Sequence, residues 1–143
     1  MKGLRAIDPA GPSGAPRPPR ARILVVTADA ALREALCPVL RAAHYEVDSA
    51  DDAIAAGYRI LRDPPDLVVA SADLPWLSGA EFAAALRADD TLPELPVILV
   101  CERSEVDALA RQAPDCALLV SPVLTDRLLE TIRRELAFRR PAR

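Results

Sequence analysis

Five short apolar runs, separated by segments with helical periodicity, constrain the fold of this chain more than any other feature of its sequence. Four of them, residues 22–27, 66–71, 96–101 and 116–120, consist largely of valine, leucine, isoleucine and alanine, whereas residues 45–49 alternate apolar with polar. Continuous runs of this kind are typical of strands buried on both faces of a parallel sheet. The sequence therefore predicts five strands.

The segments between these runs predict five helices. Apolar residues recur at helical spacing within residues 32–40, 54–61, 79–88, 103–112 and 128–136. In the second of these helices the apolar positions are Ile54, Tyr58 and Leu61. Asp29 and Asp51 stand where an N-cap residue would begin the first and second helices. Prolines at residues 64–65 end the second helix, because proline has no amide hydrogen and disfavours helix just before it.

Strands that alternate with helices through short loops imply right-handed crossovers and a parallel sheet covered on both faces. We therefore expect an α/β protein of the flavodoxin-like, doubly wound (βα)5 class, with a five-stranded parallel sheet in the order 2-1-3-4-5. Ligands of such sheets bind beyond the carboxyl ends of the strands. Thr27, Ser71, Cys101 and Ser121, which end four of the runs, are thus the expected centre of the functional site.

The chain length of 143 residues fits one domain, which we place at residues 22–137. Residues 1–21 are rich in Pro, Gly and Arg and are expected to form a disordered tail, and residues 138–143 a basic C-terminal tail. Residues 1–22 and 133–143 each hold five basic residues against one acidic residue, although the net charge is −3. Such ends either bind an acidic partner or keep the chain soluble. The acidic total gives no reason to expect nucleic-acid binding.

Several classes of protein are excluded by the sequence. It has no apolar run of roughly 18 residues that would span a membrane, and no apolar segment of a signal peptide. Cys37, Cys101 and Cys116 lack metal-ligand spacing and are interpreted as small buried side chains in a reducing cytoplasm. No phosphate-binding loop, nucleophile elbow or zinc-protease motif is present, so we expect neither an enzyme nor a cofactor.

Taken together, these segments resemble the receiver domain of bacterial response regulators, the CheY-like domain of two-component signalling. The resemblance rests on Ile23-Leu-Val-Val, Pro65-Asp-Leu-Val-Val, Leu74-Pro75 with Gly79, Leu95-Pro-Val-Ile-Leu and the Ser121-Pro122 step. Each motif is weak alone, but their order and spacing over residues 22–137 are specific. The resemblance implies a part in phosphorelay signal transduction.

The resemblance also implies a set of reactive side chains that this chain lacks. A working receiver has a phosphoacceptor aspartate ending the third strand, an acid pair after the first strand that holds Mg²⁺, a Ser or Thr ending the fourth and a Lys ending the fifth. Metal and lysine offset the charge of the phosphoryl group. The matching positions are Thr27 and Ala28 for the acid pair, then Ser71, Cys101 and Ser121. All five depart from the pattern, so we interpret the chain as a pseudo-receiver that is not phosphorylated on aspartate.

Two functional hypotheses follow from this interpretation. In the first, the domain acts by phosphorylation-independent protein–protein interaction with a histidine kinase, an output protein or a scaffold, either as a stand-alone adaptor or as part of a longer protein. In the second, it is a small-ligand sensor whose emptied pocket accepts a neutral or weakly anionic molecule, because fewer carboxylates repel an anion less. A pocket filled by Trp76 or Leu74 favours the first hypothesis, and a concave cavity with ordered density in it favours the second.

Several residues near the expected pocket could have either a specific functional role or an ordinary structural one. Asp29 and Asp73, the carboxylates expected there, are either weak cation ligands or, as we favour, a helix cap and a solvated loop residue. Cys101 would need a nearby cation to become a reactive thiol. We expect no disulfide between Cys101 and Cys116, because it would have to join opposite ends of the sheet. We interpret Ser71 as a hydrogen-bonding residue. The only histidine, His44, is expected at the surface, where the second strand opens.

Partner contacts are predicted at two places. Trp76 either packs over the vacated pocket or anchors a partner, because aromatic side chains dominate interface hot spots. In related receivers the fourth helix, fifth strand and fifth helix mediate dimers and partner contacts. The resemblance therefore makes Arg111, Leu118 and Arg127 candidate partner-binding residues, with a homodimer through the last helices. Leu118 also stands at the position of the family's aromatic switch residue.

Overall fold

A computed structural model describes residues 21–138. Apart from Ala21 and Phe138, the tails predicted at residues 1–21 and 138–143 lie outside the described residues. Five strands form one parallel sheet in the order β2-β1-β3-β4-β5. They are β1 (Arg22–Val26), β2 (Glu46–Ala50), β3 (Leu67–Ser71), β4 (Val97–Cys101) and β5 (Ala117–Val120). The predicted fold class and strand order are confirmed.

Five helices and one short 3-10 turn connect the strands. The helices are α1 (Ala30–Ala42), α2 (Ala53–Arg62), α3 (Gly79–Ala88), α4 (Val106–Gln112) and α5 (Thr125–Phe138). The helix predicted at residues 103–112 begins as a 3-10 turn at Arg103–Glu105. Helix α5 runs through Phe138, one residue beyond the predicted end of the domain. Among residues 21–138, no helix combines the length and apolar character needed to cross a membrane.

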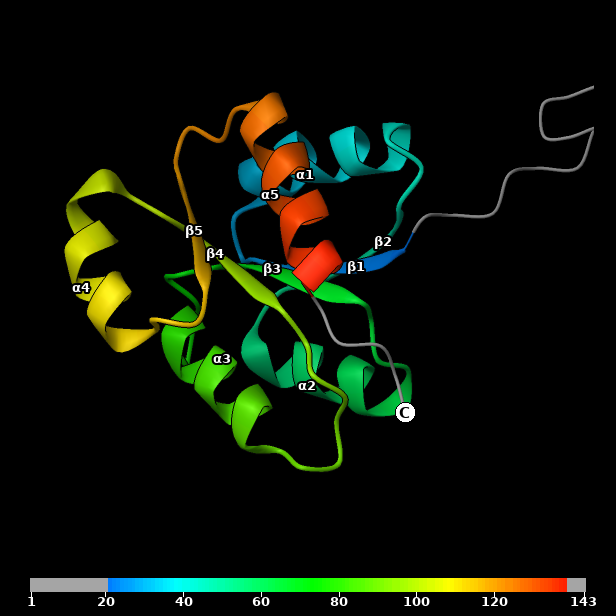
Figure 1. The fold of residues 1–143 in the computed structure, drawn as a ribbon, viewed down its shortest axis with the longest axis vertical. Helices are drawn as coiled ribbons and strands as arrows, with labels where there is room; N and C mark the ends of the chain where they lie inside the picture. The colour runs from blue at the N-terminus through cyan, green and yellow to red at the C-terminus, as the bar shows by residue number, and fades with distance from the viewer. Residues whose placement is uncertain (1–20, 139–143) are drawn as a thin grey trace, which may run out of the picture.

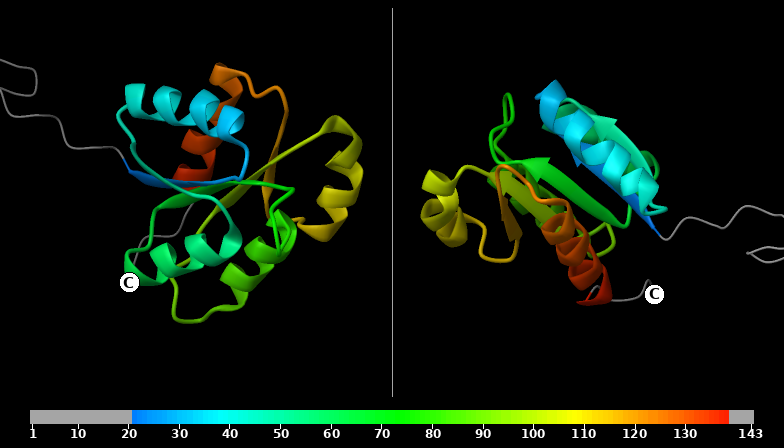
Figure 2. Two further views of the ribbon diagram at one scale, coloured as in Figure 1. Left: turned by 180° about the vertical axis from the view of Figure 1, so that it is seen from behind. Right: turned by 90° about the horizontal axis from the view of Figure 1, so that it is seen from above.

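The helices cover the sheet in two layers, α1 and α5 on one face and α2 and α3 on the other (Figure 1). Seen from behind, the same two layers enclose the sheet (Figure 2). Successive residues of a strand point to opposite faces. In β1, accordingly, Leu24 and Val26 pack in the core with α2, α3 and α4, whereas Ile23 and Val25 pack in the core with α1 and α5. This alternation explains why the central strands are apolar throughout.

The helix ends show where the sequence prediction was right and where it was wrong. Asp29 is the N-cap of α1, and its side chain accepts the amides of Ala31 and Leu32. The N-cap of α2 is Asp52, not Asp51, because the Asp52 side chain reaches the amide of Ala55 at 2.8 Å. Helix α2 ends before the prolines, as predicted.

His44 lies just outside α1 and does not open β2. Its φ of 73° places it in the left-handed region. The amides of His44 and Tyr45 donate to the carbonyls of Arg41 and Leu40 at 2.9 and 3.1 Å, which closes the helix with a Schellman motif. His44 is exposed, so its predicted place at the surface is confirmed, and its role is to end a helix.

Candidate functional site

A pocket of about 430 Å³ lies at the carboxyl ends of the strands. The residues that line it are Thr27, Ala28, Asp29, Leu32, Ser71, Asp73, Val100, Cys101, Glu102, Glu105 and Ser121. All five positions matched to the family's reactive residues are among them. The order of the strands brings these positions together at the carboxyl ends of four strands, β1, β3, β4 and β5, as expected for a doubly wound sheet.

Two hydroxyl groups bond to each other at the base of this pocket. The Ser71 Oγ donates to the Thr27 Oγ1 at 2.7 Å, and the backbone amide of Asp29 donates to the same Thr27 oxygen at 3.1 Å. Thr27 is only 1% exposed. Both lone pairs of the Thr27 hydroxyl are therefore engaged by protein donors. A neutral, hydrogen-bonded pair stands where the family pattern would place carboxylates from two strands.

The carboxylates around the pocket do not fit the Mg²⁺ site that the family implies. Asp29 uses one oxygen to accept the amides of Ala31 and Leu32 at 2.9 and 3.3 Å, which confirms its predicted role as a cap. Asp73 is exposed. Within residues 21–138, no three acidic, cysteine or histidine side chains gather closely enough to hold a metal ion.

Glu102 and Glu105 also line the pocket, and the sequence analysis missed them. Both follow β4, in and beside the 3-10 turn, where the Glu105 carboxylate accepts the amide of Glu102 at 2.8 Å. Together with Asp29 and Asp73, these two residues bring the number of carboxylates that line the pocket to four. No basic side chain is among the residues that line it. This charge disfavours an anionic ligand and limits the sensor hypothesis to neutral or cationic molecules.

The Cys101 thiol has no feature of a reactive cysteine. It is buried, and burial raises its pKa, with the nearby charges of Glu105 and Glu102 raising it further. A thiol held in its protonated form is a poor nucleophile. Cys116 precedes β5, whereas Cys101 ends β4 and pairs in register with Val120 at the far end of β5. All three cysteines are free.

Arg33 fastens the loop after β1 to the loop after β2. Its Nη2 donates to the carbonyl oxygen of Thr27 at 2.7 Å and to the Asp51 Oδ1 at 2.6 Å. Its buried Nε is the one buried side-chain nitrogen or oxygen without a hydrogen bond in the part of the chain that the structure describes. Asp51, which was predicted to cap α2, instead accepts a hydrogen bond from Arg33 and so links the two loops. The guanidinium holds Thr27 in place from behind the pocket.

Trp76 does not cover the pocket. Its side chain is 83% exposed and is absent from the pocket lining, so packing over the vacated site is ruled out in this structure. Its φ of 73° is unusual for a bulky residue and costs roughly 1–2 kcal/mol relative to the right-handed region. Leu74 is buried in the core below and does not line the pocket. The pocket is open, and an exposed tryptophan stands on the loop beside it.

The three other candidate partner residues lie away from the pocket. Arg111 is in the last turn of α4 and Arg127 in the first turns of α5, and both are exposed. Leu118 lies on β5 and is half-buried against the core. They come from three elements at the β5 edge of the sheet, as the resemblance implied, while Trp76 lies on the β3–α3 loop.

Comparison with known proteins agrees with this geometry. Residues 23–132 match the family described as the response regulator receiver domain. The chain belongs to this family. As a receiver domain it is a signalling domain of two-component systems, a family whose members interact with other signalling proteins.

Two curated response regulators illustrate the relation. The domain is 34% identical over 124 residues to the response regulator MprA of Mycobacterium leprae, covering 84% of this chain and 53% of MprA. It is 32% identical over 118 residues to the response regulator protein FleR of Pseudomonas aeruginosa, covering 80% of this chain and 24% of FleR. The receiver domain therefore spans about half of the one relative and a quarter of the other.

Solved structures share the architecture. A putative response regulator from Chloroflexus aurantiacus superposes with a TM-score of 0.77 at 25% identity, over 85% of this chain and 99% of that one. The chemotaxis response regulator CheY4 of Vibrio cholerae superposes with a TM-score of 0.71 at 25% identity, over 80% and 97% of the two chains. This chain thus matches nearly the whole of both solved chains.

Proposed function

We propose that this receiver domain signals without phosphorylation, through protein–protein contacts. The observation that carries the proposal is the hydrogen-bonded pair of Thr27 and Ser71, which fills the positions of an acidic ligand and the phosphoacceptor with two neutral hydroxyls bonded to each other. Phosphoryl transfer depends on positioning and on cations that offset the negative charge. The pocket lining offers carboxylates and no cation for that purpose.

A direct test is incubation of the full chain with acetyl phosphate and Mg²⁺, followed by intact-mass measurement. We expect no mass increase of one phosphoryl group and the same partners captured with or without the treatment. An active receiver domain of another protein is the positive control. Stoichiometric, acid-stable or acid-labile phosphorylation of this chain would contradict the proposal.

The partners that we propose are other signalling proteins, as expected for a member of this family. We propose a histidine kinase, an output protein or a scaffold as the partner, contacted through Trp76 and through Arg111, Leu118 and Arg127. We also propose a homodimer through the last helices and a cytoplasmic location. The proposal includes no catalytic, nucleic-acid-binding or membrane function. Capture of partners with Trp76 variants and with an Arg111→Glu/Arg127→Glu variant separates the two surfaces.

Replacing Trp76 by glycine is expected to stabilise the fold and weaken partner binding. Glycine adopts positive φ freely, so the change should raise the free energy of unfolding by about 0.5–1 kcal/mol. Loss of an exposed aromatic anchor should cost about 2 kcal/mol of binding. Trp76→Ala is the matched control, because it removes the ring but keeps the backbone strain. Urea unfolding and calorimetric binding of a captured partner measure both effects, and unchanged binding in both variants would exclude Trp76 as an anchor.

The second candidate function is a sensor of a neutral or cationic small molecule, and the open, carboxylate-lined pocket is the observation in its favour. A screen for ligands by thermal shift, repeated on Ser71→Leu to fill the pocket, tests it. A ligand that stabilises the unaltered chain and not the filled variant would favour the sensor over the interaction module.

A further inference from the structure

Helix α2 exposes an apolar stripe to solvent. Ile54, Tyr58 and Leu61 are 57%, 71% and 62% exposed. Residues spaced by four and three positions lie on one side of a helix. The residues of α2 that face the core are a different set, namely Ala53, Ala56 and Ile60. The stripe therefore contributes nothing to the packing of this chain on its own sheet.

A glycine lies beside this stripe, in the interior of α2. A Cβ atom added at Gly57 would meet no heavy atom within 4 Å, so the fold itself leaves room for a side chain there. Glycine destabilises a helix interior relative to alanine, and it allows the backbone of another element to come close. Gly57 next to Tyr58 thus offers a shallow surface on which a second helix can pack.

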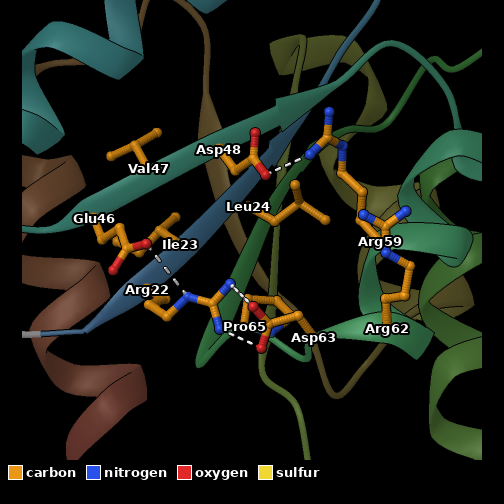
Figure 3. Close-up of a pocket in the computed structure, with 10 residues that line it drawn as sticks. All are labelled: Arg22, Ile23, Leu24, Glu46, Val47, Asp48, Arg59, Arg62, Asp63 and Pro65. Atoms are coloured by element: carbon orange, nitrogen blue, oxygen red, sulfur yellow. Dashed lines mark hydrogen bonds and ion pairs between the residues drawn. The ribbon is translucent and has the colours of Figure 1, made fainter.

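The charges at the two ends of α2 have opposite sign. Asp51 and Asp52 precede its first turn, and Arg59 and Arg62 lie in its last turn. Figure 3 shows Arg59 bonded to Asp48 of β2, while no such contact reaches Arg62. The hydrogen bond from Arg22 lowers the pKa of the neighbouring Asp63 carboxyl, which also forms its ion pair with Arg22, and the charge of Arg62 lowers this pKa further. Asp51 is paired with Arg33, yet its side chain is 79% exposed.

We propose that the α2 stripe, Ile54, Tyr58 and Leu61, binds the same stripe of a second copy of this chain in antiparallel orientation. A two-fold axis passing between Gly57 and Tyr58, the midpoint of the stripe, would place each Ile54 beside the partner copy's Leu61. The same axis brings the acidic end of each helix to the basic end of the other. Such a self-complementary surface is what a two-fold dimer requires.

The size of the surface sets the strength of this dimer. Helix α2 has ten residues, so it is about 15 Å long. Stable interfaces bury about 800 Å² on each partner, which is more than so short a helix supplies. The dimer is therefore weak and depends on concentration. This dimer is independent of the proposal that the domain signals without phosphorylation. It uses α2, which covers the face of the sheet opposite to α5, whereas the family's dimer contacts were expected at the last helices.

Sedimentation equilibrium of the full chain between about 10 µM and 1 mM tests the dimer. Leu61→Asp should raise the dissociation constant by about tenfold or more. The comparison variant is Leu124→Asp, because Leu124 has a similar exposure of 64% but lies directly before α5, so that it reports on the homodimer proposed through the last helices. A chain that stays monomeric at every concentration, or a dimer lost in Leu124→Asp and kept in Leu61→Asp, would overturn the proposal.

Gly57→Ala separates the dimer from stability of the fold. It should raise the melting temperature of the monomer by about 2–4 °C and at the same time weaken the dimer. A stabilised chain with an unchanged dissociation constant would contradict close helix contact at Gly57.

The antiparallel orientation is tested by cross-linking. On a Cys116→Ser background, Ile54→Cys and Leu61→Cys chains should form a disulfide-linked dimer when mixed, and neither should do so alone. Cross-links in the separate chains and none in the mixture would show a parallel arrangement and contradict the proposed axis.

Discussion

Replacing Gly79 by alanine is expected to destabilise the domain by about 3 kcal/mol or more. A Cβ atom at this position would lie 2.4 Å from the carbonyl oxygen of Ser71, 2.9 Å from the Cα of Ala72 and 3.0 Å from the Leu99 Cδ2. Two of these three neighbours are backbone atoms and cannot move independently of β3. The Gly79 amide also donates to the Ala72 carbonyl at 2.9 Å, which holds the start of α3 against the end of β3.

Gly57→Ala is the control for this prediction, since both glycines lie in helices but only Gly79 is sterically enclosed. Gly57→Ala should stabilise by about 0.5–1 kcal/mol. Urea unfolding followed by circular dichroism, at a concentration where the chain is monomeric, measures both. Two alanine variants of equal stability would mean that the tight contact between α3 and β3 does not govern the fold.

Thr27→Asp is expected to destabilise the domain by about 2–3 kcal/mol at pH 7. The new carboxylate would be buried at the base of the pocket, where Asp29, Glu102 and Glu105 already place negative charge. Burial and these like charges would raise its pKa above the ordinary value. Because the folded state would then bind the proton more tightly than the unfolded state, the penalty should be absent at low pH. It should grow as pH rises from about 4 and level off above the raised pKa.

Thr27→Asn isolates the charge in this experiment, because asparagine has the same shape without a titratable group. Its penalty should not change between about pH 4 and pH 7. The difference in unfolding free energy between the two variants, measured across that range, reports the electrostatic part alone. A Thr27→Asp variant as stable as Thr27→Asn at pH 7 would show that the pocket still accommodates a family-type carboxylate.

The pocket could be predicted because the chain order of strands and helices fixes which ends meet. Thr27, Ser71, Cys101 and Ser121 are far apart in sequence, yet each follows a strand of one parallel sheet, so they had to converge. What the sequence does not contain is the course of the loops between them. The loop after β4 folds back as a 3-10 turn and carries Glu102 and Glu105 into the lining.

Adjacent residues of similar chemistry were the main source of error. Asp51 and Asp52 are both able to cap a helix, and the sequence alone does not decide which one does. The distant Arg33 decides it by pairing with Asp51, which leaves Asp52 to cap α2. Similarly, the spacing of Ile54, Tyr58 and Leu61 predicted a helix correctly but did not show which face is buried. Small alanines pack α2 on the sheet instead.

Trp76 illustrates an alternative that the sequence left open. Burial of an aromatic ring is favourable, which is why the sequence analysis allowed Trp76 to pack over the pocket as well as to anchor a partner. In the structure the backbone at Trp76 lies in the left-handed region, and the ring is exposed to solvent. Of the two places that the sequence allowed for Trp76, the structure shows the exposed one, and this is where we propose a partner contact.

Amide NMR tests most directly whether the pocket supports phosphorylation, which we propose it does not. The labelled chain is titrated with Mg²⁺ and then with beryllofluoride, a mimic of the phosphoryl group. A chain in which Thr27→Asp, Ala28→Asp, Ser71→Asp, Cys101→Thr and Ser121→Lys are combined serves as positive control. We expect saturable shifts in that control and none at Thr27, Ser71 or Cys101 of the unaltered chain. Saturable shifts at these amides in the unaltered chain would contradict this proposal and would assign the metal to Asp29 or Asp73.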